Sequence, residues 1–507
     1  MSARSSSFSD DDLKYARGVG ARVPPSQRAL KILERITLVH VLVLFVGITW
    51  AFGGQADFLR LPIAWWGSLG VLITLTAAQD REAWRDGWMR PLWWLVPFVL
   101  FNIFVIAGAL NPSFREMKLG TETVLLNVGG KVGLPSSARP ALALQALWLF
   151  DALWIAAFNL VLVLRQRRAV RLLLLVVVGN ALALAVFGTA QKLMNAPGLF
   201  FGQVPSPQKA FFSTFIYHNH WGAFAVLMLA ACLGLIWHFA RRKDARDFFH
   251  TPAFGGVVVL VIIAAAIPLS TSRSCTLLMI ALLGGAFLHW IWRLVKKRRR
   301  FRESVALPVG GAFLALVAAV GAIWFVAKDS ITVRMAKSRE QIATMRAEGS
   351  IGDRAVLYRN TWKMAKDKPA YGWGMASYPH VFTIYNTRTS PDRLPVFYND
   401  AHSDWLQSLA EHGFVGTALL GLCGLLPLLR LRARHFATPV PGYLLAGCGL
   451  LLLYAWIEFP FGNLAVVFTW WICFFAAITY ARLQDREAPS PTKSSSGAPG
   501  DAEAEAA

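Results

Sequence analysis

The sequence predicts an all-α integral membrane protein of about 12 transmembrane helices, with both termini cytoplasmic and one large outer loop that contains short helices. Three observations predict this class. Of the 507 residues, 55% are apolar and only 16% are charged. The apolar residues form blocks of about 20, which as helices cross a hydrocarbon layer of roughly 30 Å. The basic residues gather between these blocks. A soluble enzyme, a secreted disulfide scaffold and a disordered chain are therefore excluded.

Twelve apolar blocks are visible, and each is predicted to span the membrane once. They lie near 35–53, 62–78, 91–110, 141–164, 169–191, 217–239, 253–270, 274–293, 305–327, 409–429, 440–457 and 462–482.

The positive charges predict the orientation, because cytoplasmic loops of membrane proteins carry an excess of Lys and Arg. With the N-terminus inside, 31 of the 51 basic residues fall on the cytoplasmic side and 8 in the short outer loops. The other 12 lie in the outer segment 328–402, which is too long to obey the rule. The net charge of +22 is therefore a topology signal, and no nucleic-acid partner is predicted.

The chain is expected to divide into five regions. They are the cytoplasmic N-terminal segment 1–34, spans 1–9 in 35–327, the large outer loop 328–408, spans 10–12 in 409–482 and a disordered cytoplasmic tail 483–507. The first 34 residues are polar and basic, so no cleavable signal peptide is predicted. The 5 cysteines lie in or beside apolar blocks without CxxC spacing, which favours packing over a disulfide or a metal.

Polar residues gather at the outer ends of spans six, seven, eight and ten, whereas the midplanes are nearly free of them. Asp151 and Asn159 in the fourth block are the exceptions. An ion-coupled transporter more often places carboxylates or broken helices near the midplane. The pattern therefore favours a site at the outer membrane surface.

Two helices are predicted inside the outer loop. The first covers 330–347, and the second runs from Asp353, as the N-cap, to Pro369. One face of the second helix is expected to carry Arg354, Tyr358, Thr361, Trp362 and Ala365, and another Arg359, Lys363 and Lys366. It is either a solvated helix that lies on the membrane or a lid that holds a phosphorylated, glycan-bearing lipid.

Arg273 lies in the shortest outer connection, between spans seven and eight. Because Ser272 or Ser274 can cap the eighth helix, the guanidinium is expected beside free backbone N–H groups, which favours a bound phosphate or pyrophosphate. The other interpretation is an interfacial Arg that reaches to lipid headgroups.

The string FFSTFIYHNHWGAF, preceded by Lys209, marks the outer mouth of span six. His218 and His220 are two residues apart on a predicted helix and so point to different sides, which argues against joint metal ligation. A nuclease is excluded because the surrounding metal-binding elements are missing. These residues, with Asn219, form either interfacial hydrogen bonds or contacts to substrate hydroxyl or phosphate groups.

The strongest local pattern is AHSDWLQSLAEHGFVGTALL at 401–420. A helical projection places His402, Leu406, Leu409, Gly413 and Gly416 on one stripe and Asp404, Gln407, Ser408 and Glu411 on the opposite side. The glycines would let a neighbouring span approach closely. His402 is then at the top of a packed seam, where it is either a base for a sugar hydroxyl or a structural or capping residue.

These motifs resemble the bacterial O-antigen ligase and polymerase superfamily. The ligase signature of His, Asn/Ser/Gln, nine residues, Gly, two residues and Gly/Thr/Tyr is matched by His402, Ser403, Gly413 and Gly416. Other family elements resemble Gly352-Asp353-Arg354, Trp362, Pro369, Gly372-Trp373-Gly374, Ser272-Arg273-Ser274 and the stretch 212–223. The likeness extends from about 209 to 420.

The resemblance implies a polytopic GT-C-type glycosyltransferase of the bacterial inner membrane, whose outer loop is periplasmic. Its donor would be a glycan on undecaprenyl diphosphate, its acceptor a hydroxyl of a glycan or of lipid A core, and no metal or other cofactor is expected. Arg273 would hold the diphosphate and His402 would orient or deprotonate the acceptor. Substrate contacts are expected from Lys209, His218, Asn219, Arg354 and Asp404. Lys209 departs from the Arg that relatives often have, and His218 from a small residue or Pro.

Three functions remain open at this point. A ligase is favoured because the His signature fits and only one outer segment is long. A polymerase of lipid-linked repeat units is second, since such enzymes share these elements but commonly have two large loops. A transporter of lipid-linked glycans that makes no bond is third.

Overall fold

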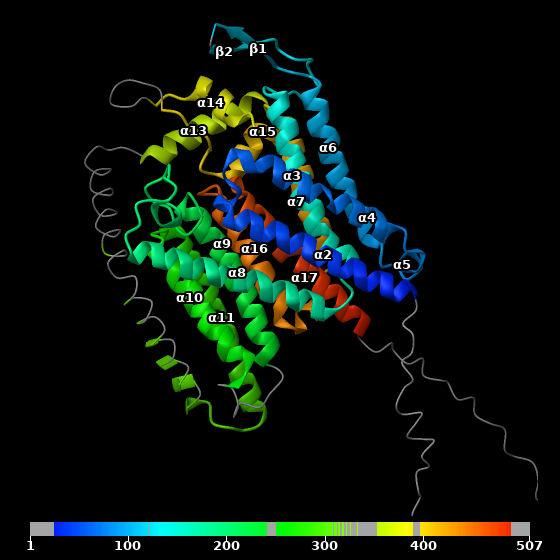
Figure 1. The fold of residues 1–507 in the computed structure, drawn as a ribbon, viewed down its shortest axis with the longest axis vertical. Helices are drawn as coiled ribbons and strands as arrows, with labels where there is room; N and C mark the ends of the chain where they lie inside the picture. Colours follow the sequence, from blue (N-terminus) through cyan, green and yellow to red (C-terminus); the bar gives the residue numbers. More distant parts are fainter. Residues whose placement is uncertain are drawn as a thin grey trace, which may run out of the picture.

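The computed structural model describes residues 25–120, 122–240, 250–307, 352–388 and 396–487, with scattered residues between 309 and 332. The described part is a helical bundle with one two-stranded sheet (Figure 1). The α-helices are α2 (Pro25–Trp50), α3 (Arg60–Ser68), α4 (Gly70–Ala78), α5 (Arg81–Arg85), α6 (Leu95–Ala109), α7 (Pro140–Val163), α8 (Arg167–Leu193), α9 (His218–Ala240), α10 (Pro252–Leu269), α11 (Arg273–Arg300), α13 (Gly352–Asp367), α14 (Tyr378–Tyr385), α15 (Asp404–Leu428), α16 (Pro439–Tyr454) and α17 (Leu464–Glu487).

Short elements connect these helices. The 3₁₀ turns are η1 (Phe52–Gly54), η2 (Asp57–Leu59), η3 (Arg90–Trp94), η4 (Phe200–Gly202), η6 (Ala433–Ala437) and η7 (Pro460–Gly462). Strands β1 (Phe114–Leu119) and β2 (Glu122–Asn127) pair antiparallel, with Phe114 opposite Asn127 and Leu119 opposite Glu122.

In the described residues, 10 helical stretches are long and apolar enough to cross a membrane, whereas the sequence predicts 12. Two blocks account for the difference. The block at 440–457 forms α16, which is apolar but has only 16 residues. The block at 305–327 lies for the most part outside the described residues. The class, a multi-pass helical membrane protein, is confirmed, and the exact count and the sides of the termini stay predictions.

The helices α7, α9 and α17 form the centre of the bundle. Their most apolar windows are 72%, 72% and 89% buried, against 22% for α11 at the periphery. Aromatic rings fill the contact between α7 and its neighbours, where Trp154 stacks on Phe98 at 4.5 Å and on Phe158 at 4.7 Å between ring centroids. The inner helices thus provide a rigid support, and the outer ones present apolar side chains to the bilayer.

One end of the bundle, which we term the loop face, carries the β1–β2 hairpin, α13 and α14 (Figure 1). These segments share a small core of their own. Its buried members are Phe114, Ala138, Leu357, Met364, Ala365, Tyr378, Val381, Phe382, Ala401 and Ala410. The end of the predicted loop is therefore packed onto α15. Apart from Thr332, the first predicted loop helix, 330–347, lies outside the described residues.

The helix α15 is interrupted at Gly413, which has φ +62° and ψ −168°. The N–H groups of Phe414 and Val415 donate to Pro369 O and Ala370 O, at 2.8 and 3.0 Å, instead of to the preceding turn.

The carbonyls released by this interruption accept from the returning chain. Ala410 O accepts from Trp373 N at 3.0 Å, and Glu411 O accepts from Gly374 N at 2.8 Å. The segment 369–374 is thereby inserted into the break in α15, and every one of these backbone groups keeps a partner.

The predicted stripe on 401–420 is therefore wrong in two respects. The helix begins at Asp404, so His402 precedes it, and the break at Gly413 separates the two glycines. Both glycines do permit close approaches, since a Cβ on Gly413 would lie 2.4 Å from Ala370 and one on Gly416 2.5 Å from the ring of Phe104.

Candidate functional site

Glu458 is the centre of a polar cluster at the loop face. It lies between α16 and η7, and its side chain is 2% exposed. One carboxylate oxygen, Oε1, is ion-paired with Nη2 of Arg354 and accepts from Nδ2 of Asn219 at 3.2 Å. The other, Oε2, lies 3.4 Å from Nδ1 of His402. One buried carboxylate thus joins α9, α13 and the start of α15.

This environment keeps Glu458 ionised. Burial by itself raises the pKa of a carboxyl group, but the hydrogen bond from His402 and the charge of Arg354 outweigh it, so the pKa of Glu458 lies below its ordinary value. The same carboxylate raises the pKa of Arg354 against the effect of burial. A fixed negative charge therefore stands behind the imidazole.

His402 lies in a short loop whose backbone is strained. Its φ of +51° is in the left-handed region, which residues other than glycine rarely adopt. Several bonds hold this conformation: Tyr358 Oη donates to His402 O at 2.8 Å, and Asp404 N donates to Glu458 O at 3.3 Å. Its ring packs edge-on against Phe459, with centroids 4.6 Å apart. Strain kept in place by so many contacts is typical of functional sites.

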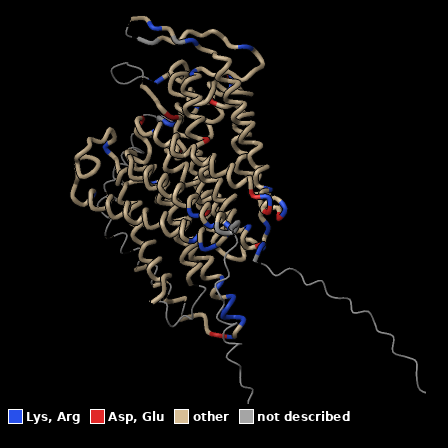
Figure 2. The backbone as a smooth tube through the Cα atoms, turned by 45° about the vertical axis from the view of Figure 1, so that its right-hand side comes forward, with Lys and Arg blue, Asp and Glu red and all other residues tan. Residues whose placement is uncertain are grey.

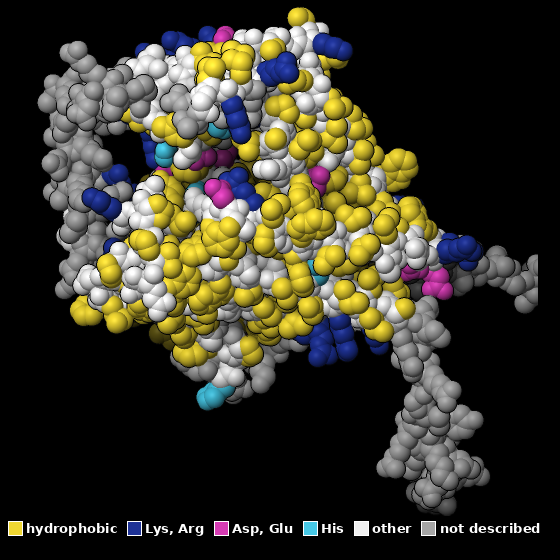
Figure 3. Space-filling view, turned by 45° about the horizontal axis from the view of Figure 1, so that its top comes forward, with side chains coloured by type: hydrophobic (Ala, Val, Ile, Leu, Met, Phe, Trp, Pro, Cys, Tyr) yellow, Lys and Arg dark blue, Asp and Glu magenta, His cyan; other side chains and the backbone are white. Residues whose placement is uncertain are grey.

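A cavity of about 520 Å³ opens in front of His402. Figure 3 shows a hollow in the loop face in which acidic and His side chains gather. The cavity is lined by Gln55, Pro207, Gln208, Ile216, Tyr217, Phe397, Tyr398, Asn399, Asp400, His402 and Phe459. Because the carboxylate of Glu458 faces Nδ1 of His402, the ring hydrogen is placed on Nδ1. The other ring nitrogen, Nε2, is then a hydrogen-bond acceptor.

Asp400 brings a second carboxyl group to the cavity. Burial raises the pKa of Asp400 to about 6, and the charge of Glu458 adds to the rise, while His402 opposes it.

The cluster continues to the start of α11. Oδ1 of Asn219 accepts from Ser272 Oγ at 2.7 Å, and Nδ2 also donates to Tyr217 Oη at 2.7 Å. Ser272 occupies the N-cap position as predicted, but its hydroxyl bonds to Asn219 and does not cap the helix. Arg273 is the exposed first residue of α11. Arg273 is therefore adjacent to Ser272, which is connected through Asn219 and Glu458 to His402.

Three of the seven predicted site residues meet at Glu458, namely His402, Arg354 and Asn219. The others have different surroundings. Asp404 Oδ2 accepts from Phe461 N at 2.9 Å and so fixes η7 against α15.

Lys209 and His218 also lie apart from Glu458. Lys209 lines a separate cavity of about 170 Å³, together with Lys192. Nδ1 of His218 lies 3.1 Å from Ala210 O, which secures the turn before α9. Neither residue lines the cavity in front of His402.

The faces predicted for the second loop helix match α13 in most respects. Arg354 and Tyr358 point to the cluster, and Thr361 is buried against Tyr378 Oη at 2.8 Å. Trp362 is the exception, because it is 43% exposed. The second face is solvent-exposed and carries Arg359, Lys363 and Lys366.

The model of one protein family matches part of the chain. Residues 258–421, from α10 to the middle of α15, match the model of the family described as O-antigen ligase. The match covers 164 of the 507 residues and supports the resemblance to the O-antigen ligase and polymerase superfamily. No curated protein matches the chain. The match supports a membrane-embedded glycosyltransferase-type enzyme of polysaccharide biosynthesis that acts on a lipid-linked glycan and an acceptor.

The O-antigen ligase domain contains Arg273, Arg354 and His402, whereas Asn219 and Glu458 lie outside it. Glu458, Tyr217 and Asp400 were not predicted as site residues from the sequence. Glu458 did carry a signal, because it is a lone carboxylate between two apolar blocks, where an ionisable side chain is costly unless it has a partner or a function.

Proposed function

We propose that the chain is an O-antigen ligase-like glycosyltransferase that moves a glycan from undecaprenyl diphosphate to an acceptor hydroxyl. The observation that carries this proposal is the pair of His402 and Glu458 at a cavity of about 520 Å³ in the loop face. The imidazole is oriented by a buried carboxylate on one side and borders a space large enough for sugar residues on the other. That arrangement suits general-base catalysis.

In the proposed step, the acceptor oxygen attacks the anomeric carbon of the donor sugar. The bond from that carbon to the diphosphate oxygen breaks, and undecaprenyl diphosphate leaves with the electron pair. The acceptor proton passes to Nε2 of His402. Glu458 then stabilises the imidazolium through Nδ1, at 3.4 Å in the structure.

Arg273 is proposed to hold the diphosphate. It is exposed at the N-terminus of the 28-residue helix α11, where backbone N–H groups and the helix dipole favour an anion. A guanidinium can also bind two phosphate oxygens at once. Arg273 and the helix N-terminus then neutralise the negative charge of the departing undecaprenyl diphosphate. We propose that no metal ion is needed to neutralise this charge.

We further propose that the loop face is periplasmic and that the protein lies in the bacterial inner membrane. The basic last turn of α11, with Lys297, Arg298, Arg299 and Arg300, lies at the end of the bundle away from the hairpin (Figure 2). An excess of positive charge marks the cytoplasmic side of membrane proteins. On this view the termini, with the segment 1–34 and the tail 483–507, are cytoplasmic.

One observation favours a polymerase as the second candidate. The segment between α6 and α7 forms the β1–β2 hairpin on the loop face and contributes Phe114 and Ala138 to the core that α13 and α14 share. The loop face is therefore built from two parts of the chain, whereas the prediction of a ligase relied on a single long loop. In a polymerase the acceptor would be a second lipid-linked repeat unit.

The decisive experiment uses the purified full-length protein in vesicles with a lipid-linked glycan donor. Lipid A core, a second lipid-linked repeat unit, or no acceptor is added in separate reactions, each with and without a chelator. Attachment to lipid A core identifies a ligase, and growth of the lipid-linked chain identifies a polymerase. Transbilayer movement of intact donor without a new bond would overturn the proposal, and loss of product with the chelator would overturn metal independence.

A further inference from the structure

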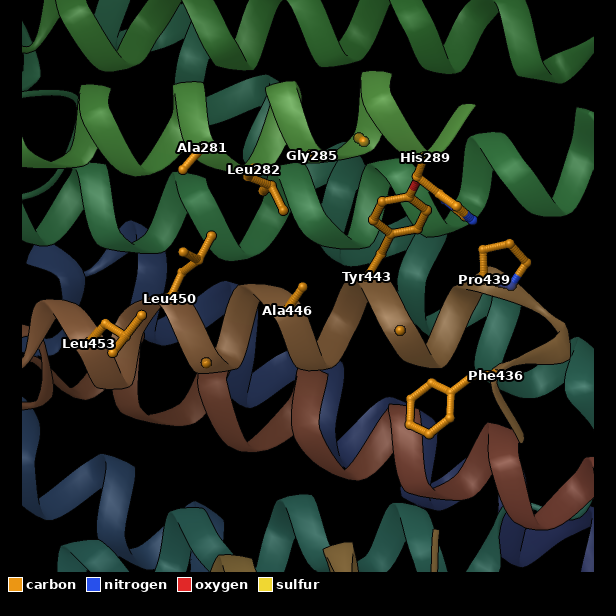
Figure 4. Close-up of a pocket in the computed structure, with 13 residues that line it drawn as sticks. Ala281, Leu282, Gly285, His289, Phe436, Pro439, Tyr443, Ala446, Leu450 and Leu453 are labelled. Carbon is orange, nitrogen blue, oxygen red and sulfur yellow. The ribbon is translucent and has the colours of Figure 1, made fainter. Parts of the chain in front are cut away.

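A second large cavity, of about 560 Å³, lies between the apolar helices α11 and α16 (Figure 4). Leu282, Ala286 and Tyr443 form its buried floor, whereas Ala281 and Ala446 are exposed at its rim. Gly285, His289 and Gly449 also line it. We call this cavity the α11–α16 groove.

The groove exists because small residues face each other across it. A Cβ added to Gly285 or to Gly449 would meet nothing within 4 Å among the residues that the structure describes, so there is open space beside both glycines. In membranes, small residues usually allow two helices to close on each other, but here α11 and α16 leave the space open. An apolar space of this size beside the bilayer is filled by apolar groups.

One end of the groove is polar. Trp237 Nε1 donates to Tyr443 Oη at 2.8 Å, so the hydroxyl proton of Tyr443 is directed at Nδ1 of His289, 2.8 Å away. His289 is therefore left with an N–H donor at Nε2. In Figure 4 His289 and Tyr443 lie side by side at one end of the groove. This end suits an occupant that is apolar along its length and accepts hydrogen bonds at its head.

The same end is strongly basic. One turn beyond His289, Arg293 stacks on Trp237 at 5.3 Å, and its buried Nε has no hydrogen-bond partner among the residues that the structure describes. Lys296 and Lys297 follow and are exposed. Within the described part of the chain, neither lysine forms an ion pair, whereas Arg298 is paired with Glu303 at 3.3 Å. The charge at this end calls for an anion.

We propose that the α11–α16 groove binds one acyl chain of an anionic phospholipid, with the lipid phosphate at the basic end of the groove, between His289 and Lys297 along α11. The length fits, because the eight residue steps from Ala281 to His289 correspond to about 12 Å of helix, close to the thickness of one leaflet, about half of a hydrocarbon core of roughly 30 Å. The head is on the opposite side from the His402 cavity, since sixteen residues, about 24 Å, separate Arg273 from His289 along α11. The site is thus distinct from the proposed donor site and does not depend on it.

The test measures phospholipid retention by the purified full-length protein. The protein is delipidated in detergent and incubated with vesicles of phosphatidylglycerol, phosphatidylcholine or phosphatidylcholine doped with undecaprenyl phosphate. Bound lipid is then quantified by mass spectrometry. The wild type is expected to retain phosphatidylglycerol preferentially.

Two kinds of variant test the acyl-chain contact and the phosphate contact of the lipid separately. Gly285→Phe and, independently, Ala446→Phe fill the groove and should lower retention about tenfold or more, whereas Leu288→Phe is the control, because Leu288 is 68% exposed and lies outside the groove lining. Lys297→Gln should lower the retention of phosphatidylglycerol about fivefold without affecting phosphatidylcholine.

Three outcomes would overturn the proposal. Equal retention of phosphatidylglycerol and phosphatidylcholine by the wild type would show that the site does not select an anionic headgroup. Preferred retention of undecaprenyl phosphate would identify a polyprenyl chain as the occupant. Unchanged retention in both groove-filled variants would show that the retained lipid binds outside the groove. Thermal unfolding of each variant verifies that it is folded.

Discussion

The Glu458 carboxylate lies 3.4 Å from Nδ1 of His402, although 56 residues separate the two in the sequence. The Glu458 carboxylate is held in place without a substrate, because Arg354 and Asn219 bind its other oxygen. The imidazole therefore needs little rearrangement to act as a base, which is the benefit of a preorganised site. It also makes Glu458 the most informative residue to change.

Glu458→Gln should lower kcat of transfer by about 10²-fold or more while leaving the protein folded. The amide keeps the shape of the side chain but removes the charge that stabilises the imidazolium. The measurement is multiple-turnover transfer at saturating lipid-linked glycan donor and several pH values. A role limited to packing predicts wild-type kcat.

His402→Ala should abolish transfer, with a loss of roughly 10²–10⁴-fold that corresponds to a general base. The double variant His402→Ala/Glu458→Gln should then be no slower than His402→Ala alone, because two residues that act as a unit are not additive. Membrane insertion and the melting temperature serve as controls. Additive losses would show that Glu458 acts independently of His402.

Much of the fold could be predicted from the sequence, because a bilayer imposes its thickness on every helix. The helix at Gly352–Asp367 was predicted within two residues from Asp353 and Pro369. The break in α15 could not be predicted, since Gly413 continues a helical apolar pattern and only the inserted segment 369–374 reveals its backbone conformation.

The candidate site was predictable only in part. His402, Arg354 and Asn219 were found from local motifs, but the contact that unites them is Glu458, which lies 104 residues from Arg354 and 239 from Asn219. Such contacts are made by the tertiary fold and leave no local periodicity. Lys209 was placed near the site because it precedes the element that contains Asn219, yet it faces another cavity.

Arg273→Lys should raise KM for the lipid-linked donor about tenfold or more, with a smaller effect on the acceptor. Lysine keeps the charge but cannot form two parallel bonds to a diphosphate. Arg359→Lys is the matched control, because Arg359 is exposed on the far face of α13. Equal KM values in the two variants would leave Arg273 as a contact to lipid headgroups.

Gly413→Ala should destabilise the protein by about 1–3 kcal/mol or prevent the segment 369–374 from docking. The backbone of Gly413 is in a region that only glycine adopts readily, and a Cβ would lie 2.4 Å from Ala370. Gly421→Ala in the same helix is the control, since a Cβ there meets nothing within 4 Å, and it should be neutral or slightly stabilising. Equal melting temperatures in detergent would contradict the inserted-segment geometry.

Asp400 should make stability depend on pH in the weakly acidic range. Its pKa is about 6 in the folded protein, above the ordinary value of 3.8, so the folded state binds more protons than the unfolded state between these values. The contribution of Asp400 to stability therefore falls as pH rises through this window and stays low above it. Relative to the wild type, Asp400→Asn should gain melting temperature at about pH 7.5 and little at about pH 4. A difference that is the same at both pH values would show that the carboxyl group of Asp400 titrates alike in the folded and unfolded states.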